Sequence, residues 1–413
     1  MTFTFPQRGI LLSHFLHLLP MIATAPRVAL ENTEIAFAYK SDQELKKAEW
    51  LFSLINNNWM MKAGTIFTPL AFKMGLPVKG LVRATMFDQF CGGEKLDDCA
   101  SVIQKLQGFN VHTILDYGVE AKESETEFEK ATMQFIRGIQ FAKESRHVPF
   151  ISVKVTGLAR FALLEKLNAR MSLNEKEKKE WEAVRARLER ICKAAGDAAV
   201  AVMIDAEETW IQEPVDFLTM EMMAQYNKEK PVVYNTIQLY RHDRLAYMKS
   251  IFEMTRKDGF IYALKLVRGA YMEKERKRAR QLRYSSPIQR DKESCDREYN
   301  AAIEFCIENI NHISFCVASH NEFSNLCAVR FADKKGLPVN HPHLHFSQLF
   351  GMSDHVTFNF AHAGYNVTKY IPYGPVQDVV PYLMRRAQEN TSVGGMSSRE
   401  LMMIRKELQR RKI

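Results

Sequence analysis

Two adjacent arginines near the C-terminal end of the chain, Arg385 and Arg386, are the clearest candidates for binding an anion. Residues 376–390 are typical of a helix, and on it Tyr382, Arg385, Arg386 and Glu389 recur at i, i+3, i+4 and i+7. These four side chains therefore share one helical face. Neighbouring guanidinium groups repel each other unless an anion lies between them, and Glu389 can neutralise only one of them. The remaining positive fork fits a planar carboxylate.

A solvated charged face is the simpler interpretation of an isolated Arg-Arg-x-x-Glu pattern. What favours a binding site is a set of polar residues upstream, each placed where a predicted strand ends. The elements that would position them therefore have to be considered first.

Eight short runs rich in β-branched and aromatic residues alternate with helical stretches along most of the chain. The runs cover residues 112–117, 149–156, 199–205, 232–239, 259–267, 312–319, 343–349 and 369–373. Strands that alternate with helices indicate parallel βαβ units, and eight of them predict an α/β fold, a closed (β/α)8 TIM-like barrel. The alternative is an open doubly wound sheet, which requires a glycine-rich phosphate turn after the first strand. Residues 116–122 do not contain one.

The domain organisation follows from the same patterns. We expect a leader or disordered segment at 1–33, an all-helical N-terminal region at 34–110 and the barrel at 111–393. A charged segment near 163–195, before the third strand, predicts a helical hairpin outside the barrel. Residues 394–413 predict a basic C-terminal helix or tail.

Composition excludes several classes of protein. The net charge of +9 is spread along the chain, and neither a zinc-finger spacing nor an RNA-binding signature is present, so nucleic acid is not the expected partner. Seven cysteines without a C-x-x-C pair fit a reducing compartment. The cluster His341, His343 and His345 has no Cys or carboxylate at ligand spacing, so we expect no metal site.

The enzymatic interpretation depends on polar residues at the carboxyl ends of the predicted strands, where barrel enzymes build their sites. Each one alone has a simpler explanation, such as an outward-pointing lysine or an acidic helix N-terminus. Their recurrence at one strand end after another is difficult to explain by packing. They are Asp116, Lys154, Asp205, Gln238, Lys265, Arg268, His320, Asn321 and Tyr370.

Several blocks of sequence, in order, resemble the proline dehydrogenase family. They include Ile204-Asp205-Ala-Glu-Glu, Lys265-Leu-Val-Arg268-Gly-Ala-Tyr271, Ala318-Ser-His320-Asn and the stretch from Tyr370 to Glu389. The resemblance runs from about Glu34 to Val393. The charged segment before strand three is similar to the insertion of the monofunctional, eukaryotic-like branch.

This resemblance implies a distorted barrel that holds FAD and oxidises L-proline to Δ1-pyrroline-5-carboxylate, with hydride transfer to flavin N5. The implied catalytic residues are Lys154, Asp205, Tyr370, Arg385, Arg386 and Glu389. The implied substrate-binding residues are Tyr271, Leu349, Tyr370, Tyr382, Arg385 and Arg386. The implied flavin contacts are Gln238, Lys265, Arg268, Ser319, His320 and Asn321. Lys265 departs from many bacterial members, which have Arg there, but agrees with the eukaryotic-like branch.

The resemblance also implies a membrane quinone as electron acceptor, with a peripheral membrane contact through the basic tail. The expected location is cytoplasmic, or the matrix side of the mitochondrial inner membrane in a eukaryote. Hydroxyproline dehydrogenase is the nearest alternative, although a bulky Tyr370 leaves little room for a ring hydroxyl. A Schiff-base aldolase using Lys154 or Lys265 is a second alternative. A basic module that binds membranes or nucleic acid is a third, and it leaves the polar strand ends unexplained.

Overall fold

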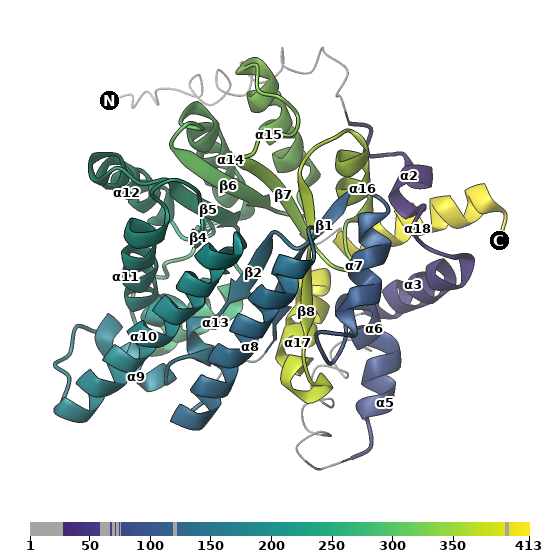
Figure 1. Cartoon of the computed structure of the whole chain (residues 1–413). Coiled ribbons are helices and arrows are strands. Elements are labelled where there is room, and N and C mark those ends of the chain that lie inside the picture. The colour runs from purple at the N-terminus through teal and green to yellow at the C-terminus, as the bar shows by residue number, and fades with distance from the viewer. Residues whose placement is uncertain are drawn as a thin grey trace, which may run out of the picture.

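A closed barrel of eight parallel strands forms the centre of the computed structural model, which confirms the predicted fold (Figure 1). Each strand pairs with the next along the chain, and β8 closes the barrel by pairing with β1. The structure describes residues 28–57, 67, 71, 74, 76–118, 122–392 and 396–413, without the side chains of 387–392, 396 and 397.

All eight predicted runs contain a strand. The strands are β1 (Val111–Tyr117), β2 (Phe150–Val153), β3 (Ala201–Ile204), β4 (Val233–Gln238), β5 (Tyr262–Val267), β6 (Ile313–Ala318), β7 (Leu344–Leu349) and β8 (Val367–Tyr373). β2 is shorter than predicted because a 3-10 turn begins at Val155, directly after Lys154. β8 begins before the predicted run because Val367 and Thr368 already pair with β1.

Helices surround the strands (Figure 1). They are α8 (Glu125–Glu144), α9 (Phe161–Asn168), α10 (Glu175–Ala198), α11 (Thr209–Tyr226), α12 (Arg244–Asp258), α13 (Met272–Leu282), α14 (Lys292–Glu308), α15 (Glu322–Lys334), α16 (Asp354–His362) and α17 (Val376–Ser392). The predicted insertion corresponds to α9 and α10. Only part of it lies outside the barrel, because Leu188 and Ile191 of α10 belong to the main hydrophobic core, as in an ordinary crossover helix.

The N-terminal region is helical where the structure describes it. Its helices are α2 (Thr33–Phe37), α3 (Asp42–Ile55), α5 (Lys79–Val82), α6 (Asp88–Phe90) and α7 (Cys99–Gln107), with a π-helical turn over Arg83–Phe87. Most of the predicted leader lies outside the described residues. Val28 and Leu30, in the last part of the predicted leader, are buried in the main core.

The C-terminal segment forms a regular helix, α18 (Met396–Arg411), which lies beside α2 and α3 (Figure 1). Its buried residues Leu401, Met403 and Ile404 join a second hydrophobic cluster with α3. The two ends of the described chain therefore pack against each other on one side of the barrel.

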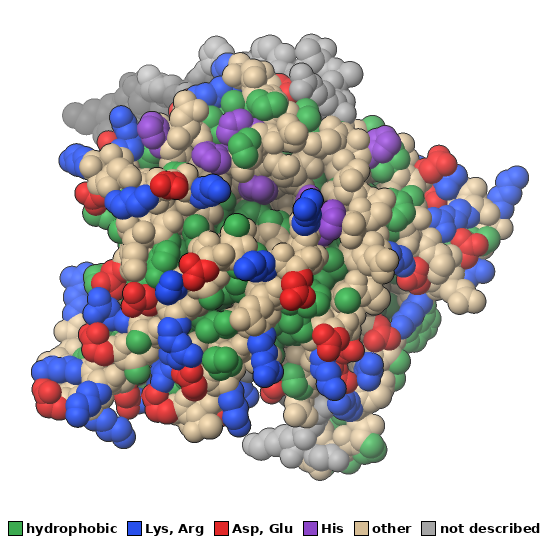
Figure 2. Space-filling model, viewed as in Figure 1, with side chains coloured by type: hydrophobic (Ala, Val, Ile, Leu, Met, Phe, Trp, Pro, Cys, Tyr) green, Lys and Arg blue, Asp and Glu red, His purple; other side chains and the backbone are tan. Residues whose placement is uncertain are grey.

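Histidines gather at the amino-terminal end of the barrel, in the upper part of Figure 2. His112 stacks on His147 with ring centroids 5.4 Å apart, and His341 contacts His343. Among the described residues, no group of three or more His, Cys, Asp or Glu side chains is placed to hold a metal ion. No helix within those residues is long and apolar enough to cross a membrane.

A glycine in the turn after β7 gives a testable constraint on the fold. Gly351 has φ +77°, and a Cβ added there would lie 2.0 Å from the backbone oxygen of Gln89. Gly336 has a similar φ of +71° with nothing within 4 Å of an added Cβ. We expect Gly336→Ala to cost about 1–2 kcal/mol of unfolding free energy through backbone strain alone. Gly351→Ala should cost about 1–3 kcal/mol more because of the clash.

Urea unfolding of both variants measures the difference. Equal losses of stability would show that the turn after β7 relaxes freely and does not depend on its contact with Gln89.

Candidate active site at the carboxyl end of the barrel

The polar residues of the site form a layer on top of an apolar plug inside the barrel. The plug contains Ile114, Phe150, Met203, Tyr234, Ala263 and Cys316. Side chains two positions apart on a strand point to the same face. Ile114 therefore places Asp116 inside the barrel, Met203 places Asp205 there, and Ala263 places Lys265 there. This alternation explains why polar groups converge at the carboxyl end.

Asp205 is the centre of this layer. Its Oδ1 accepts hydrogen bonds from Ser152 Oγ at 2.6 Å and from Lys265 Nζ. Its Oδ2 accepts a bond from Tyr370 Oη at 2.9 Å and lies 3.1 Å from Lys154 Nζ. One carboxylate therefore connects side chains from β3, β5, β8 and the end of β2.

The charges of this layer are partly compensated. Burial by itself would raise the pKa of Asp205, but the ammonium groups of Lys265 and Lys154 hold it well below its usual value. Asp116 shares Lys154 with Asp205, and the Nζ of that lysine lies 2.8 Å from Asp116 Oδ1. Burial raises the pKa of Asp116 despite that contact. The two carboxyls thus have opposite shifts around one lysine.

Tyr370 is buried beside these groups. Its hydroxyl contacts Ser152 Oγ at 3.2 Å as well as Asp205, and Lys265 Nζ lies 5.4 Å from its ring centroid. Burial and the neighbouring carboxylates raise the pKa of Tyr370 well above 10, so the phenol is neutral at physiological pH. Its hydroxyl therefore acts as a hydrogen-bond donor to Asp205.

Helix α17 brings the arginine pair to the same end of the barrel. Arg385 lies over the ring of Tyr271, which follows β5, with its guanidinium carbon 5.7 Å from the ring centroid. Arg386 is buried and lies 4.9 Å from the ring centroid of Tyr382 on its own helix. The side chain of Glu389 lies outside the described residues. α17 continues to Ser392, with Pro381 within it, two residues beyond the predicted end.

The residues that match flavin contacts form a second polar group after β5 and β6. Arg268 donates to Asp296 Oδ1 at 2.9 Å, Ser319 Oγ at 2.7 Å and Ser324 Oγ at 2.8 Å. Asn321 caps α15 by accepting a hydrogen bond from the Ser324 backbone N–H at 2.9 Å. Lys265 belongs instead to the Asp205 network, so the predicted substrate and cofactor groups meet at that carboxylate.

The surroundings of His320 favour its neutral form. Burial, together with the nearby cations Lys369 and Arg386, lowers the pKa of His320 to about 3. Its Nδ1 lies 2.9 Å from Ser353 Oγ. Arg386 on α17 is therefore close enough to His320, which follows β6, for its charge to lower the pKa of that histidine.

Gln238 offers an observation on whether a cofactor fits. Its Nε2 donates to the carbonyl oxygens of Glu207 at 2.9 Å and Ala206 at 3.3 Å. Its Oε1 is buried without a hydrogen-bond partner. A buried carbonyl that lacks a donor is costly, so a ligand with N–H or O–H groups would stabilise it. The end of β4 therefore suits a hydrogen-bonding cofactor.

The sequence alone assigns no role to Ser152, although its hydroxyl contacts both Asp205 and Tyr370. It identifies Asp116 only as one of the polar residues at strand ends. The strand alternation predicts an inward position for both residues. Ser152 lies two residues after the inward-facing Phe150, and Asp116 lies two residues after the inward-facing Ile114. Leu349 packs at the margin of the second hydrophobic cluster and accepts a hydrogen bond from Lys369 on its backbone oxygen.

A family model described as proline dehydrogenase matches residues 99–399. The chain belongs to the proline dehydrogenase family. Membership places it among oxidoreductases. It is 30% identical to proline dehydrogenase 1, mitochondrial, of Dictyostelium discoideum, an alignment that covers 92% of this chain and 74% of the relative. It is also 32% identical to a hydroxyproline dehydrogenase of Xenopus laevis, with 80% and 78% covered.

Solved structures share the fold. The proline utilization A protein of Bdellovibrio bacteriovorus, in a crystal structure described as inactivated by N-propargylglycine, superposes with a TM-score of 0.69 at 20% identity. The match covers 92% of this chain but only 41% of that longer one. At this identity the likeness supports the barrel architecture alone.

The Asp205 network leads to a prediction about stability and pH. Asp205→Asn leaves two buried ammonium groups without their shared carboxylate, which should cost about 3 kcal/mol of unfolding free energy at pH 7. Because the native pKa of Asp205 lies below its unfolded value of about 3.9, this contribution is present above that pH. It should be lost as the pH falls below about 4.

Urea unfolding of the wild-type and Asn variants at pH 7, 5 and 3.5 measures this dependence. Asp197→Asn is the control, since Asp197 pairs with Lys193 on the exposed surface and should contribute less than about 0.5 kcal/mol. A pH-independent difference for Asp205→Asn would contradict the assigned charge state.

Proposed function

We propose that the protein oxidises L-proline to Δ1-pyrroline-5-carboxylate with FAD as cofactor. The observation that carries this proposal is the meeting of three groups at one end of the barrel: the Arg385–Arg386 pair, the Asp205 network and the neutral His320. Family membership and the mitochondrial proline dehydrogenase relative give it independent support.

The arginine pair would bind the carboxylate of proline. Arg385 and Arg386 sit against the aromatic faces of Tyr271 and Tyr382, which limits how far each guanidinium can move. Each charge-assisted contact with a carboxylate contributes about 1.5–3 kcal/mol. Glu389, one turn further along α17, would brace the pair. Leu349 and the two tyrosines would form the walls around the pyrrolidine ring.

Lys154, Asp205 and Tyr370 would close the other side of the substrate site. Each is fixed by at least two contacts within the network, so this wall is rigid before substrate arrives. A preformed wall reduces the entropy lost when the ring is held in a reactive position. The proline nitrogen has to be neutral for oxidation, and solvent would take its proton, because both nearby carboxyls are already engaged by Lys154.

FAD would be held by Gln238, Lys265, Arg268, Ser319, His320 and Asn321. When bound, the flavin supplies a two-electron acceptor for hydride transfer at N5. The unpaired Oε1 of Gln238 suits the polar donors of such a cofactor. The cations Lys265 and Arg268 would favour negative charge developing on the cofactor.

Proline is favoured over hydroxyproline by the position of Tyr370. Its hydroxyl donates to Asp205 and contacts Ser152, so a movement of the ring that admits a substrate hydroxyl would break both contacts. The Schiff-base alternative is disfavoured for a similar reason. Lys154 and Lys265 both donate to Asp205 or Asp116, whereas a nucleophilic lysine needs a free, neutral amine.

The electron acceptor would be a membrane quinone, with the enzyme at a membrane surface. The Dictyostelium relative is described as mitochondrial, which supports a mitochondrial location. The basic residues of α18 are the proposed contact. They also pair with the N-terminal region, because Arg405 forms an ion pair with Glu49 of α3 and Lys406 lies 3.5 Å from Glu31, ahead of α2. Both cations remain about half exposed.

The experiment that tests the function is an anaerobic visible spectrum before and after addition of L-proline. Flavin bands that bleach with proline support the proposal. Bleaching with hydroxyproline alone would favour the other substrate, and a protein that stays colourless after incubation with FAD would overturn the proposal.

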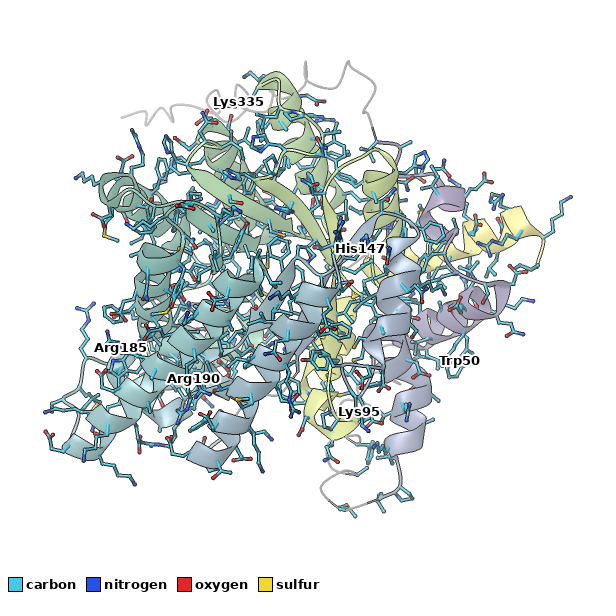
Figure 3. All side chains as sticks on the ribbon, viewed as in Figure 1. Trp50, Lys95, His147, Arg185, Arg190 and Lys335 are labelled. Carbon is cyan, nitrogen blue, oxygen red and sulfur yellow. The ribbon has the colours of Figure 1, made fainter. Side chains whose placement is uncertain are left out.

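The carboxylate contact predicts a specific loss of activity. Arg385→Met should lower kcat/KM for proline by about 10- to 150-fold, the equivalent of one lost charge-assisted contact, while the flavin spectrum is retained. Arg190→Met is the matched control, because Arg190 lies on α10 (Figure 3) and pairs with Glu129 on the surface. Full activity in Arg385→Met would contradict the carboxylate assignment.

The membrane contact predicts a change in liposome binding. Exchange of Arg405, Lys406, Arg410 and Arg411 for Gln should weaken sedimentation with anionic liposomes. The control is Glu31→Gln with Glu49→Gln, which removes ion-pair partners but keeps the cations, and it should bind at least as well as wild type. Equal binding by all three proteins would show that α18 is only a packing helix.

A further inference from the structure

Helix α18 makes a buried contact that its role as a terminal packing helix does not require. Glu400, in the first half of the helix, is only 3% exposed and accepts a hydrogen bond from the backbone N–H of Ser353. Its Oε1 also lies 4.0 Å from His355 Nδ1. Burial raises the pKa of Glu400. Burying a carboxyl group is costly, so its position in this network calls for an explanation.

Ser353 is an unusual residue for Glu400 to contact. It directly precedes α16 and has φ 51° and ψ 43°, a left-handed conformation that costs a residue with a side chain about 1–2 kcal/mol. Such a conformation persists only where its surroundings enforce it. The bond from Glu400 fixes the Ser353 backbone, and the Ser353 side chain in turn places Oγ 2.9 Å from His320 Nδ1.

α18 makes a second connection on the other side of His320. Arg399, the neighbour of Glu400, donates from Nε to Glu322 Oε1 at 2.8 Å. Glu322 is the first residue of α15, two positions after His320, and it also contacts His355 Nε2 at 2.9 Å. α18 therefore reaches the surroundings of His320 by two routes. One runs through Glu400 and Ser353, and the other runs through Arg399 and Glu322.

We propose that α18 positions His320 for the cofactor, with Glu400 and Arg399 as positioning residues that act through Ser353 and Glu322. The C-terminal helix is thereby part of the cofactor site although it contributes no residue to the barrel. This inference rests on the proposed FAD-dependent function. This positioning role explains why two neighbouring charged residues, Arg399 and Glu400, face the barrel near the start of α18.

The chain contains a matched control on the same helix. Glu407 lies seven residues after Glu400 and is fully buried as well, but it pairs with Arg410 and Arg411 of α18 itself. Glu407→Gln therefore weakens the charge balance of the helix without touching the Ser353 turn. Glu400→Gln keeps an oxygen that can accept the Ser353 N–H, whereas Glu400→Leu keeps only the volume.

The test uses the full chain and measures FAD affinity by flavin fluorescence, the flavin midpoint potential and the Tm of the FAD-free protein. We expect Glu400→Leu to weaken FAD binding by about tenfold, which corresponds to loss of one buried hydrogen bond, and to shift the potential. Glu400→Gln should lie between it and wild type. Glu407→Gln should lower the Tm while its FAD affinity stays within about twofold of wild type.

Equal effects of the Glu400 and Glu407 substitutions on FAD binding would overturn the inference. If Glu400→Leu does not fold, Arg399→Gln gives the same test from the partly exposed side of the network, and unchanged FAD affinity and potential there would overturn it. Wild-type protein that binds FAD but is not bleached by proline would overturn the proposed substrate and leave these titrations interpretable. Wild-type protein that binds no FAD would overturn both.

Discussion

The structure of the site depends on one carboxylate held between two ammonium groups. Asp205 contacts Lys154 and Lys265, and the residues around it gain their positions from these contacts. Two cations and one anion cannot be buried separately at acceptable cost, so the three side chains have to converge. Tyr370 and Ser152 complete the coordination of the same carboxylate. The polar layer at the carboxyl end of the barrel is therefore positioned by electrostatics, next to an apolar plug that fills the barrel interior.

The arginine pair is positioned by helix α17 and by the barrel together. α17 supplies the repeating face, and the barrel supplies Tyr271 as a surface for Arg385. A guanidinium stacked on an aromatic ring is held in a fixed orientation, and its planar fork matches the geometry of a carboxylate. His320 stays neutral near Arg386 because burial and positive charge both disfavour its protonation. Cationic and neutral groups thus coexist within one small region, which suits the binding of an amino acid beside a cofactor.

The C-terminal segment is basic in composition, but in the structure several of its basic residues form ion pairs with acidic residues. Arg405 and Arg411 pair with acidic residues of α3, and Lys406 pairs with Glu31 ahead of α2, which ties the two ends of the described chain together. On the face shown in Figure 2, Lys and Arg side chains are interspersed with Asp and Glu. A net charge of +9 therefore does not translate into one basic field on this face.

The sequence by itself determined the eight strands, the helical N-terminal region and the face of α17, because periodicity and strand spacing are local properties of the chain. It also placed Asp205, Lys265 and Tyr370 at strand ends. Only the tertiary structure decided that these three meet Ser152 and Lys154, because register around a closed barrel depends on all eight strands at once. The contact of Glu400 with Ser353 was likewise beyond sequence reasoning, since nothing local links residues so far apart in the chain.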